Sequence, residues 1–186
     1  GSEMCIRDRK NTLIIFASDN GAAIQAPIKI LNCNAGFKGR KGTLYEGGIR
    51  VPFIVNQPGM VPIQTLDNLI YFPDMMPTLA ALAKGTKHLP KQINGINILP
   101  LFYGKQVDTD NRLLYWEFPG KQRAARKGDW KCVTIHPNQP LDNLKENPEE
   151  TNKLAKKSPR RVKEFDEEMQ RMHIPTPNWP QPGEQF

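Results

Sequence analysis

The sequence predicts an α/β protein that ends in a small α+β subdomain. Two short apolar segments, residues 12–17 and 51–55, have the length and composition of sheet strands, and the run at 13–17 is typical of a buried parallel strand. A helix is expected over residues 74–83, with Asp74 as its cap and Gly85 just past its end. The third observation is a change of pattern after about residue 109, where short strand-like segments take over.

The part of the chain after residue 109 predicts an antiparallel sheet covered by one helix. Segments 113–118, 122–126 and 130–135 read as short strands that form a meander. The final helix begins at Ser158, a good cap, and it repeats apolar residues along one face: Val162, Phe165, Met169 and Met172. We therefore expect a larger part over residues 10–108 and a small subdomain with a proline-rich tail over 109–186. Residues 1–9 fit neither part and are taken as a tag or an artefact.

Directly after the first apolar run comes Ser18-Asp19-Asn20-Gly21. Ligands gather at the carboxyl ends of strands in open α/β sheets, and carboxylate and carboxamide oxygens are the donors that a hard cation such as calcium prefers. The same residues also favour an ordinary turn, because Asn and Gly tolerate left-handed backbone. Both interpretations of Asp19 and Asn20 stand at this point.

A cationic, glycine-rich loop follows over residues 36–52 and leads into the second apolar segment. It holds five glycines and four cations, among them Lys41. Glycines let a backbone approach an anion closely, and a lysine among backbone amides makes a strong contact to an oxyanion. The loop is not a Walker A phosphate loop, because Lys41 follows Arg40 and precedes Gly42.

Together the strand with Ser-Asp-Asn-Gly and the sequence Lys-Gly-Thr-Leu-Tyr-Glu-Gly-Gly-Ile-Arg-Val-Pro at 41–52 resemble the formylglycine-dependent sulfatases of the alkaline phosphatase superfamily. Segments 72–83, 94–101, 114–118, 123–131 and 141–154 are similar to the same family, so the resemblance covers about 10–180. It implies the C-terminal part of an alkaline-phosphatase-like sheet sandwiched by helices, followed by the small α+β subdomain.

Carried onto this chain, the resemblance implies that Asp19 and Asn20 are two ligands of a calcium ion and that Lys41 contacts the sulfate. Glu46 and Arg50, four residues apart in the same loop, are expected to pair with each other and to support the site without touching substrate. His88 and His173 are expected to face solvent or to have structural roles. His136, at the end of a predicted strand, is a weak candidate for a residue near the substrate.

The nucleophile that the family uses is not expected in this chain. Family members oxidise the Cys or Ser of a Cys/Ser-x-Pro-x-Arg motif to formylglycine, and none of Cys5, Cys33 and Cys132 has proline two positions on. Since family members are usually more than twice as long, we expect a C-terminal fragment that is inactive alone.

The charge and composition limit the classes of ligand that this chain is expected to bind. The net charge of +7 is concentrated around the anion loop and the amino terminus, with no nucleic-acid-binding module, so a sulfate ester or sulfated glycan fits better than nucleic acid. No apolar run approaches the about 18 residues that span a bilayer. The chain itself does not indicate a location, whereas an intact family member is expected to be periplasmic or secreted.

Three functions remain open from the sequence. The first is a fragment of a sulfuric-ester hydrolase that acts on sulfated carbohydrate. The second is a noncatalytic module that binds anions or sulfated glycans, and the third is a phosphatase or phosphodiesterase relative of the same superfamily. The last would need paired metals, and no Asp-x-x-x-His cluster lies near Asp19.

Overall fold

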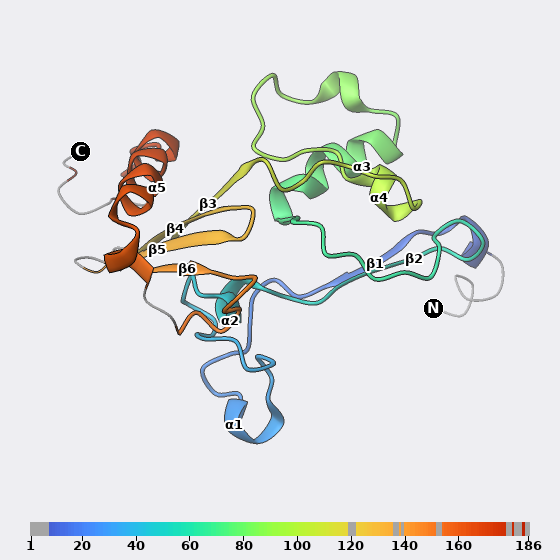
Figure 1. Cartoon of the computed structure of the whole chain (residues 1–186). Helices are drawn as coiled ribbons and strands as arrows, with labels where there is room; N and C mark the ends of the chain where they lie inside the picture. Colours follow the sequence, from blue (N-terminus) through green and yellow to red (C-terminus); the bar gives the residue numbers. More distant parts are fainter. Residues whose placement is uncertain are drawn as a thin grey trace. The chain divides into compact units, whose positions relative to one another are not determined.

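The structure is a computed structural model that describes residues 8–118, 122–135, 138, 140–151, 154–177, 180 and 184, with the backbone alone at 28 and 29. The chain forms two compact units (Figure 1). The first unit is Gly1–Ala17 with Pro52–Asn111, and the second is Ser18–Val51 with Arg112–Phe186. This grouping differs from the expected single boundary at 108/109, because residues 18–51 belong with the C-terminal sheet.

A two-stranded antiparallel ribbon forms the sheet of the first unit. Strands β1 (Ile14–Ala17) and β2 (Phe53–Asn56) pair with Ala17 opposite Phe53 and Phe16 opposite Ile54. The expected strands are therefore present, but the expectation that the first is a buried parallel strand is wrong. The partner that this chain offers is the returning strand β2, and side chains exposed and half-buried in turn show that one face is covered.

The helices of the first unit are η2 (Arg9–Asn11), η3 (Phe72–Asp74), α3 (Met75–Leu82), η4 (Thr86–His88) and α4 (Leu99–Phe102). Ile98, Leu101 and Phe102 form the buried centre, against which Ile15 and Val55 pack. The predicted helix is present, and Asp74 stands before α3. Its carboxylate accepts the backbone N–H groups of Tyr71 and Ile96, both at 2.9 Å, rather than one from α3 itself.

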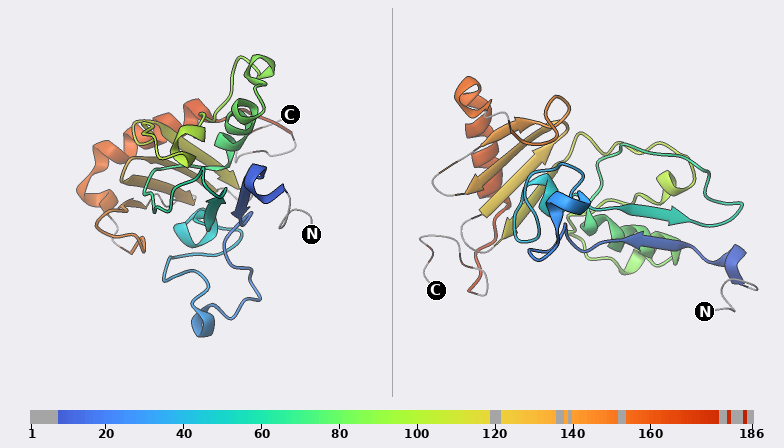
Figure 2. Two further views of the ribbon diagram at one scale, coloured as in Figure 1. Left: turned by 90° about the vertical axis from the view of Figure 1, so that its right-hand side faces the viewer. Right: turned by 90° about the horizontal axis from the view of Figure 1, so that it is seen from below.

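The second unit contains a four-stranded antiparallel sheet (Figure 2). Its strands are β3 (Leu113–Phe118), β4 (Gln122–Lys127), β5 (Trp130–Ile135) and β6 (Leu141–Asn143), in that order across the sheet. The predicted meander is confirmed, and β6 extends it by one strand. The helices of this unit are α1 (Ile28–Leu31), α2 (Glu46–Ile49), η5 (Leu154–Lys157) and α5 (Pro159–Met172).

This sheet has a different layer on each face. Phe165 and Met169 of α5 pack on Ala125 and Cys132, as the periodicity of the helix predicts. The neighbouring positions Ala124 and Val133 point to the opposite face and pack against Leu44 of the glycine-rich loop. The sheet therefore presents one face to α5 and the other to the loop that carries Lys41.

Replacing Met169 tests the packing of α5. Its side chain is fully buried, so Met169→Ala should lower the free energy of unfolding by about 2–5 kcal/mol through lost burial and a cavity. Arg160→Ala on the exposed side of α5, where the side chain is 94% exposed, is the control and should change it by about 0.5 kcal/mol or less. Denaturant unfolding of the two variants measures both; equal effects would contradict the assigned face.

His173, which follows α5, gives stability a pH dependence. Its Nδ1 lies 2.5 Å from Oε1 of Glu117, and its Nε2 pairs with Glu184. Burial lowers the pKa of His173, but the hydrogen bonds and charges of Glu117 and Glu184 outweigh this and raise it. The protonated ring therefore stabilises the folded state below the unfolded pKa of about 6.5, and this contribution is lost as pH rises through the raised folded value.

His173→Gln should thus lose stability relative to the unmodified chain at acidic pH and approach it at alkaline pH. Urea unfolding at a series of pH values gives the difference. A difference that stays constant with pH would show that the imidazolium contributes nothing.

Candidate functional site

The segment Ser18-Asp19-Asn20-Gly21 forms a local turn at the start of the second unit. The Ser18 hydroxyl donates to the carbonyl of Asn20 at 2.8 Å, and the Asn20 amide donates to the carbonyl of Gly21 at 3.1 Å. The carboxylate of Asp19 is exposed and, within the described part of the chain, forms no hydrogen bond or ion pair. The predicted turn is therefore present, and the Asp19 carboxylate on it is exposed to solvent.

Backbone hydrogen bonds join this turn to the glycine-rich loop. Gly21 N–H donates to the carbonyl of Gly48 at 2.9 Å, and Lys41 N–H donates to the carbonyl of Ala22 at 2.9 Å. A side chain on Gly21 would place its Cβ 1.9 Å from the carbonyl oxygen of Gly47, so only glycine permits this approach. Asp19, Asn20 and Lys41 therefore stand on directly bonded segments of one unit.

Lys41 lies in a tight turn closed by Thr43. Thr43 N–H and its hydroxyl both donate to the carbonyl of Arg40, at 3.0 and 2.8 Å. Gly39 and Gly42 flank the two cations with φ near +87° and +88°, the left-handed region that favours glycine. Lys41 is exposed, and among the described residues its ammonium has no ion-pair partner. Its charge is therefore available to an anion in solution.

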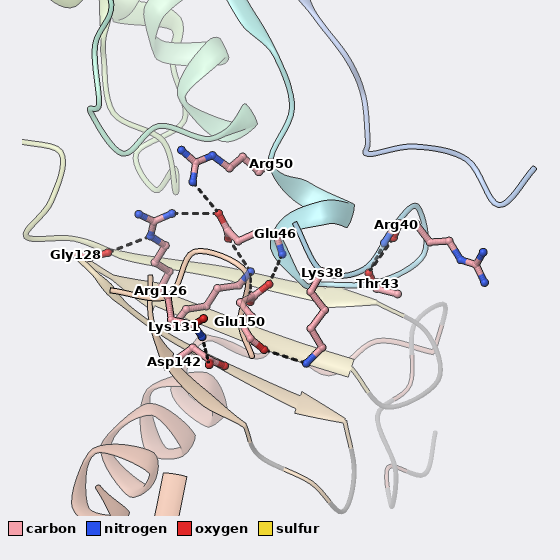
Figure 3. Close-up of polar contacts among 11 residues, drawn as sticks. Lys38, Arg40, Thr43, Glu46, Arg50, Arg126, Gly128, Lys131, Asp142 and Glu150 are labelled. Atoms are coloured by element: carbon pink, nitrogen blue, oxygen red, sulfur yellow. Dashed lines mark hydrogen bonds and ion pairs between the residues drawn. The ribbon is translucent and has the colours of Figure 1, made fainter. Parts of the chain in front are cut away.

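A cluster of charged side chains surrounds the buried carboxylate of Glu46, the first residue of α2 (Figure 3). Arg50 Nη1 lies 3.6 Å from Glu46 Oε2, so the expected pair is present, with Arg50 half exposed. A nearer partner is Lys131 of β5, whose Nζ lies 2.8 Å from Glu46 Oε1, and Arg126 of β4 contributes a third cation at 3.6 Å. Burial alone would raise the pKa of Glu46, but Lys131 and the two arginines hold it below its usual value.

Glu150 completes the cluster from the segment after β6. Its Oε1 lies 3.0 Å from Lys131 Nζ, and its Oε2 accepts the backbone N–H of Glu46 at 2.6 Å. Burial raises the pKa of Glu150, with Lys131 opposing that rise. Lys38 Nζ donates to the carbonyl of Glu150 at 3.3 Å while it lies over the ring of Tyr45.

Sequence reasoning did not identify Lys38, Arg126, Lys131 or Glu150 as part of the site. Lys131 and Glu150 lie 85 and 104 positions from Glu46, and no local pattern joins residues that far apart. The one available signal was a lysine at an inward-facing position of a predicted strand, since a buried cation requires an acidic partner.

Asp19 and Asn20 supply the type of donor that calcium prefers but too few of them. Calcium takes about 6–8 oxygen ligands, and these two side chains provide a carboxylate and a carboxamide. No group of three or more His, Cys, Asp or Glu side chains that could hold a metal occurs in the described ranges. These residues alone therefore do not form a calcium site.

The described residues offer no activated nucleophile at this site. Burial raises the pKa of the Cys132 thiol to about 12, with Asp166 and Asp142 adding to the rise, so this thiol stays protonated in the core. Cys33 is exposed and free. His88 is exposed on η4 of the first unit, His173 is held by two carboxylates, and His136 lies outside the described residues.

Comparison with known proteins gives the family. The Sulfatase family model matches residues 7–86, which extends the family segment into the last three of the nine residues set aside above. The chain is 36% identical over 116 residues to a sulfatase of Formosa agariphila, covering 60% of this chain and 20% of that protein. It is 33% identical over 144 residues to human steryl-sulfatase, covering 72% of this chain and 25% of that protein.

Comparison with solved structures points to the same family. A Bacteroides thetaiotaomicron structure, from work on the metabolism of multiple glycosaminoglycans by that bacterium, superposes with a TM-score of 0.78 at 26% identity. The superposed region covers 91% of this chain and 40% of the Bacteroides chain. The chain thus spans about a fifth to a quarter of the curated relatives and two fifths of the solved chain. Within the described ranges, no helix is long and apolar enough to cross a bilayer. The matched segment, the relatives and the shared alkaline-phosphatase-like fold place this chain in the sulfatase family.

Proposed function

We propose that this chain carries the sulfate-recognition part of a sulfatase that hydrolyses sulfate esters of carbohydrate. The observation that carries the proposal is the hydrogen bond from Lys41 N–H to the carbonyl of Ala22, which places the backbone of an exposed lysine beside the Asp19–Asn20 turn. An ammonium without an internal partner, held on a glycine-rich turn, suits a sulfate oxygen.

In this proposal Lys41 binds the sulfate group and stabilises the charge that builds on its oxygens as the ester S–O bond breaks. Removing one such preorganised donor typically costs about 10²–10³ in kcat. The nucleophile that attacks sulfur comes from polypeptide outside the described residues. The function of Glu46 and Arg50 is indirect, since both lie in the charged cluster that supports the loop.

We further propose that Asp19 and Asn20 are two ligands of a calcium ion, with the other ligands supplied from outside the described residues. Calcium would add positive charge next to the sulfate oxygens. Asp19 supports this because its carboxylate is exposed and lacks an internal partner in the described part of the chain.

The substrate class that we propose is sulfated carbohydrate. One structural relative belongs to glycosaminoglycan metabolism, whereas another relative is a steryl-sulfatase, so the two classes must be compared directly. A net charge of +7 favours a polyanionic glycan over a steroid that carries a single sulfate. For the intact protein we propose a secreted or periplasmic location.

Lys41→Ala tests the proposal in the polypeptide encoded by the uninterrupted reading frame that contains this chain. That polypeptide should hydrolyse an aryl sulfate and release sulfate from a sulfated disaccharide, and Lys41→Ala should lower kcat/KM by about 10²-fold or more. Lys163→Ala, an exposed lysine of α5, is the matched control and should leave turnover unchanged. The 186-residue chain alone should show no turnover.

Other outcomes separate the alternatives. Binding of sulfated disaccharide to the chain without turnover by the longer polypeptide would support a noncatalytic glycan-binding module. Faster hydrolysis of phosphate esters than of sulfate esters would support a phosphatase or phosphodiesterase relative. Preference for steryl sulfate over the disaccharide would overturn the carbohydrate assignment alone.

A further inference from the structure

We infer that Lys131 is a positioning residue for the anion site: by bridging the buried carboxylates of Glu46 and Glu150, it holds the glycine-rich loop that carries Lys41 and the turn that carries Asp19. The inference deepens the proposed function and rests on it for the identity of the site. The contacts that support it all lie within the second unit, and Figure 3 shows those among Glu46, Lys131 and Glu150.

The first step concerns the charge of Lys131. Its side chain is fully buried, and its ammonium lies 2.8 Å from Glu46 and 3.0 Å from Glu150. Both of these carboxylates are also buried, with exposed fractions of 3% and 1%. Two buried carboxylates repel each other. Arg50 and Arg126 pair with Glu46, and Lys131 is the cation that contacts both carboxylates and so holds Glu46 and Glu150 close together.

The second step leads from the carboxylates to α2. Glu150 Oε2 accepts the N–H of Glu46 at 2.6 Å, which binds the first backbone donor of α2. The segment that presents Glu150 is itself anchored to the sheet, because Glu150 N–H donates to Asn147 and the Asn147 amide donates to Asp142 of β6 at 3.1 Å. Lys131 on β5 and Glu150 on the segment anchored to β6 thus hold the start of α2.

The third step leads from α2 to the site. Gly47 N–H donates to the carbonyl of Lys38 at 2.7 Å, and the carbonyl of Gly48 accepts from Gly21. The residue after Gly21 accepts from Lys41 N–H. This series of backbone bonds connects the start of α2 with both Lys41 and the Asp19 turn. Two side chains add to it: Asn34 accepts from Ala22 N–H at 3.3 Å and donates to the carbonyl of Gly39, and Gln122 donates to the carbonyl of Gly42 at 3.3 Å.

If Lys131 only stabilised the unit in general, its loss would affect both faces of the sheet, whereas the loss of a positioning residue should affect the loop face. Lys131 faces the loop, whereas its neighbour Cys132 faces α5, so the two layers of the unit can be tested separately. Arg123 of β4 offers a matched control. It is a partly buried cation that pairs with Asp166 of α5 at 3.7 Å, and it touches none of the loop residues named above.

The experiment is amide hydrogen exchange on the 186-residue chain, with Lys131→Met, Lys131→Arg and Arg123→Met as variants. Lys131→Met should speed exchange at Gly47, Gly21 and Lys41 by tenfold or more, most at Gly47. Exchange at Val133 and Leu144, whose N–H groups bond to Pro140 and Asp129, should stay within about threefold. Lys131→Arg should restore much of the protection, and Arg123→Met should leave the three loop amides unchanged.

A second readout is the affinity for inorganic sulfate. Lys131→Met should weaken binding by as much as Lys41→Ala, and the double variant should be no weaker than either, because both changes act on the same contact. If Lys131→Met does not fold, Glu150→Gln keeps the volume and the Lys131–Glu46 pair, and it should still speed exchange at Gly47.

Several results would overturn the inference. Unchanged exchange at the three loop amides in folded Lys131→Met would do so, as would an equal acceleration at loop and sheet amides, since that is general destabilisation. If the unmodified chain binds no sulfate, that result counts against the proposed function. The hydrogen-exchange measurement still tests whether Lys131 positions the loop.

Discussion

The second unit depends on one arrangement, a single lysine charge buried between two carboxylates from distant parts of the chain. Lys131 comes from the middle of the sheet, Glu46 from the start of α2, and Glu150 from the segment after β6. Burying an ion pair contributes little net stability, but removing one partner leaves an uncompensated charge that is costly. The arrangement therefore enforces geometry more than it adds stability, and the geometry that it enforces is that of the loop.

The sheet separates two kinds of packing. On the side of α5, apolar side chains such as Phe165 and Met169 bury surface without directional requirements. On the side of the loop, Leu44 gives a small apolar contact, and the rest is fixed by charges and backbone hydrogen bonds with defined geometry. A loop that must hold an ammonium in one place benefits from the second kind, because hydrogen bonds specify direction as well as distance.

The sequence predicted what is encoded locally. The strands of the meander, the start of α5 and the pairing of Glu46 with Arg50 all follow from residues within a few positions of one another, and the structure contains them. Lys131 and Glu150 could not be assigned to the site, because their roles arise only when distant segments meet. The antiparallel direction of β1 was missed for a related reason: periodicity gives the period of a strand, not its partner.

The connection between the strands of the ribbon has a consequence for variation in the loop. The segment that carries the site leaves at Ala17 and returns at Phe53, and these two residues face each other across the ribbon. The ribbon is thus a hairpin interrupted by a long excursion, and the entropy of closing such a loop grows only slowly with its length. Related chains can lengthen or shorten the excursion and keep the register of the hairpin, whereas a one-residue shift inside either strand would turn its apolar side chains to the other face.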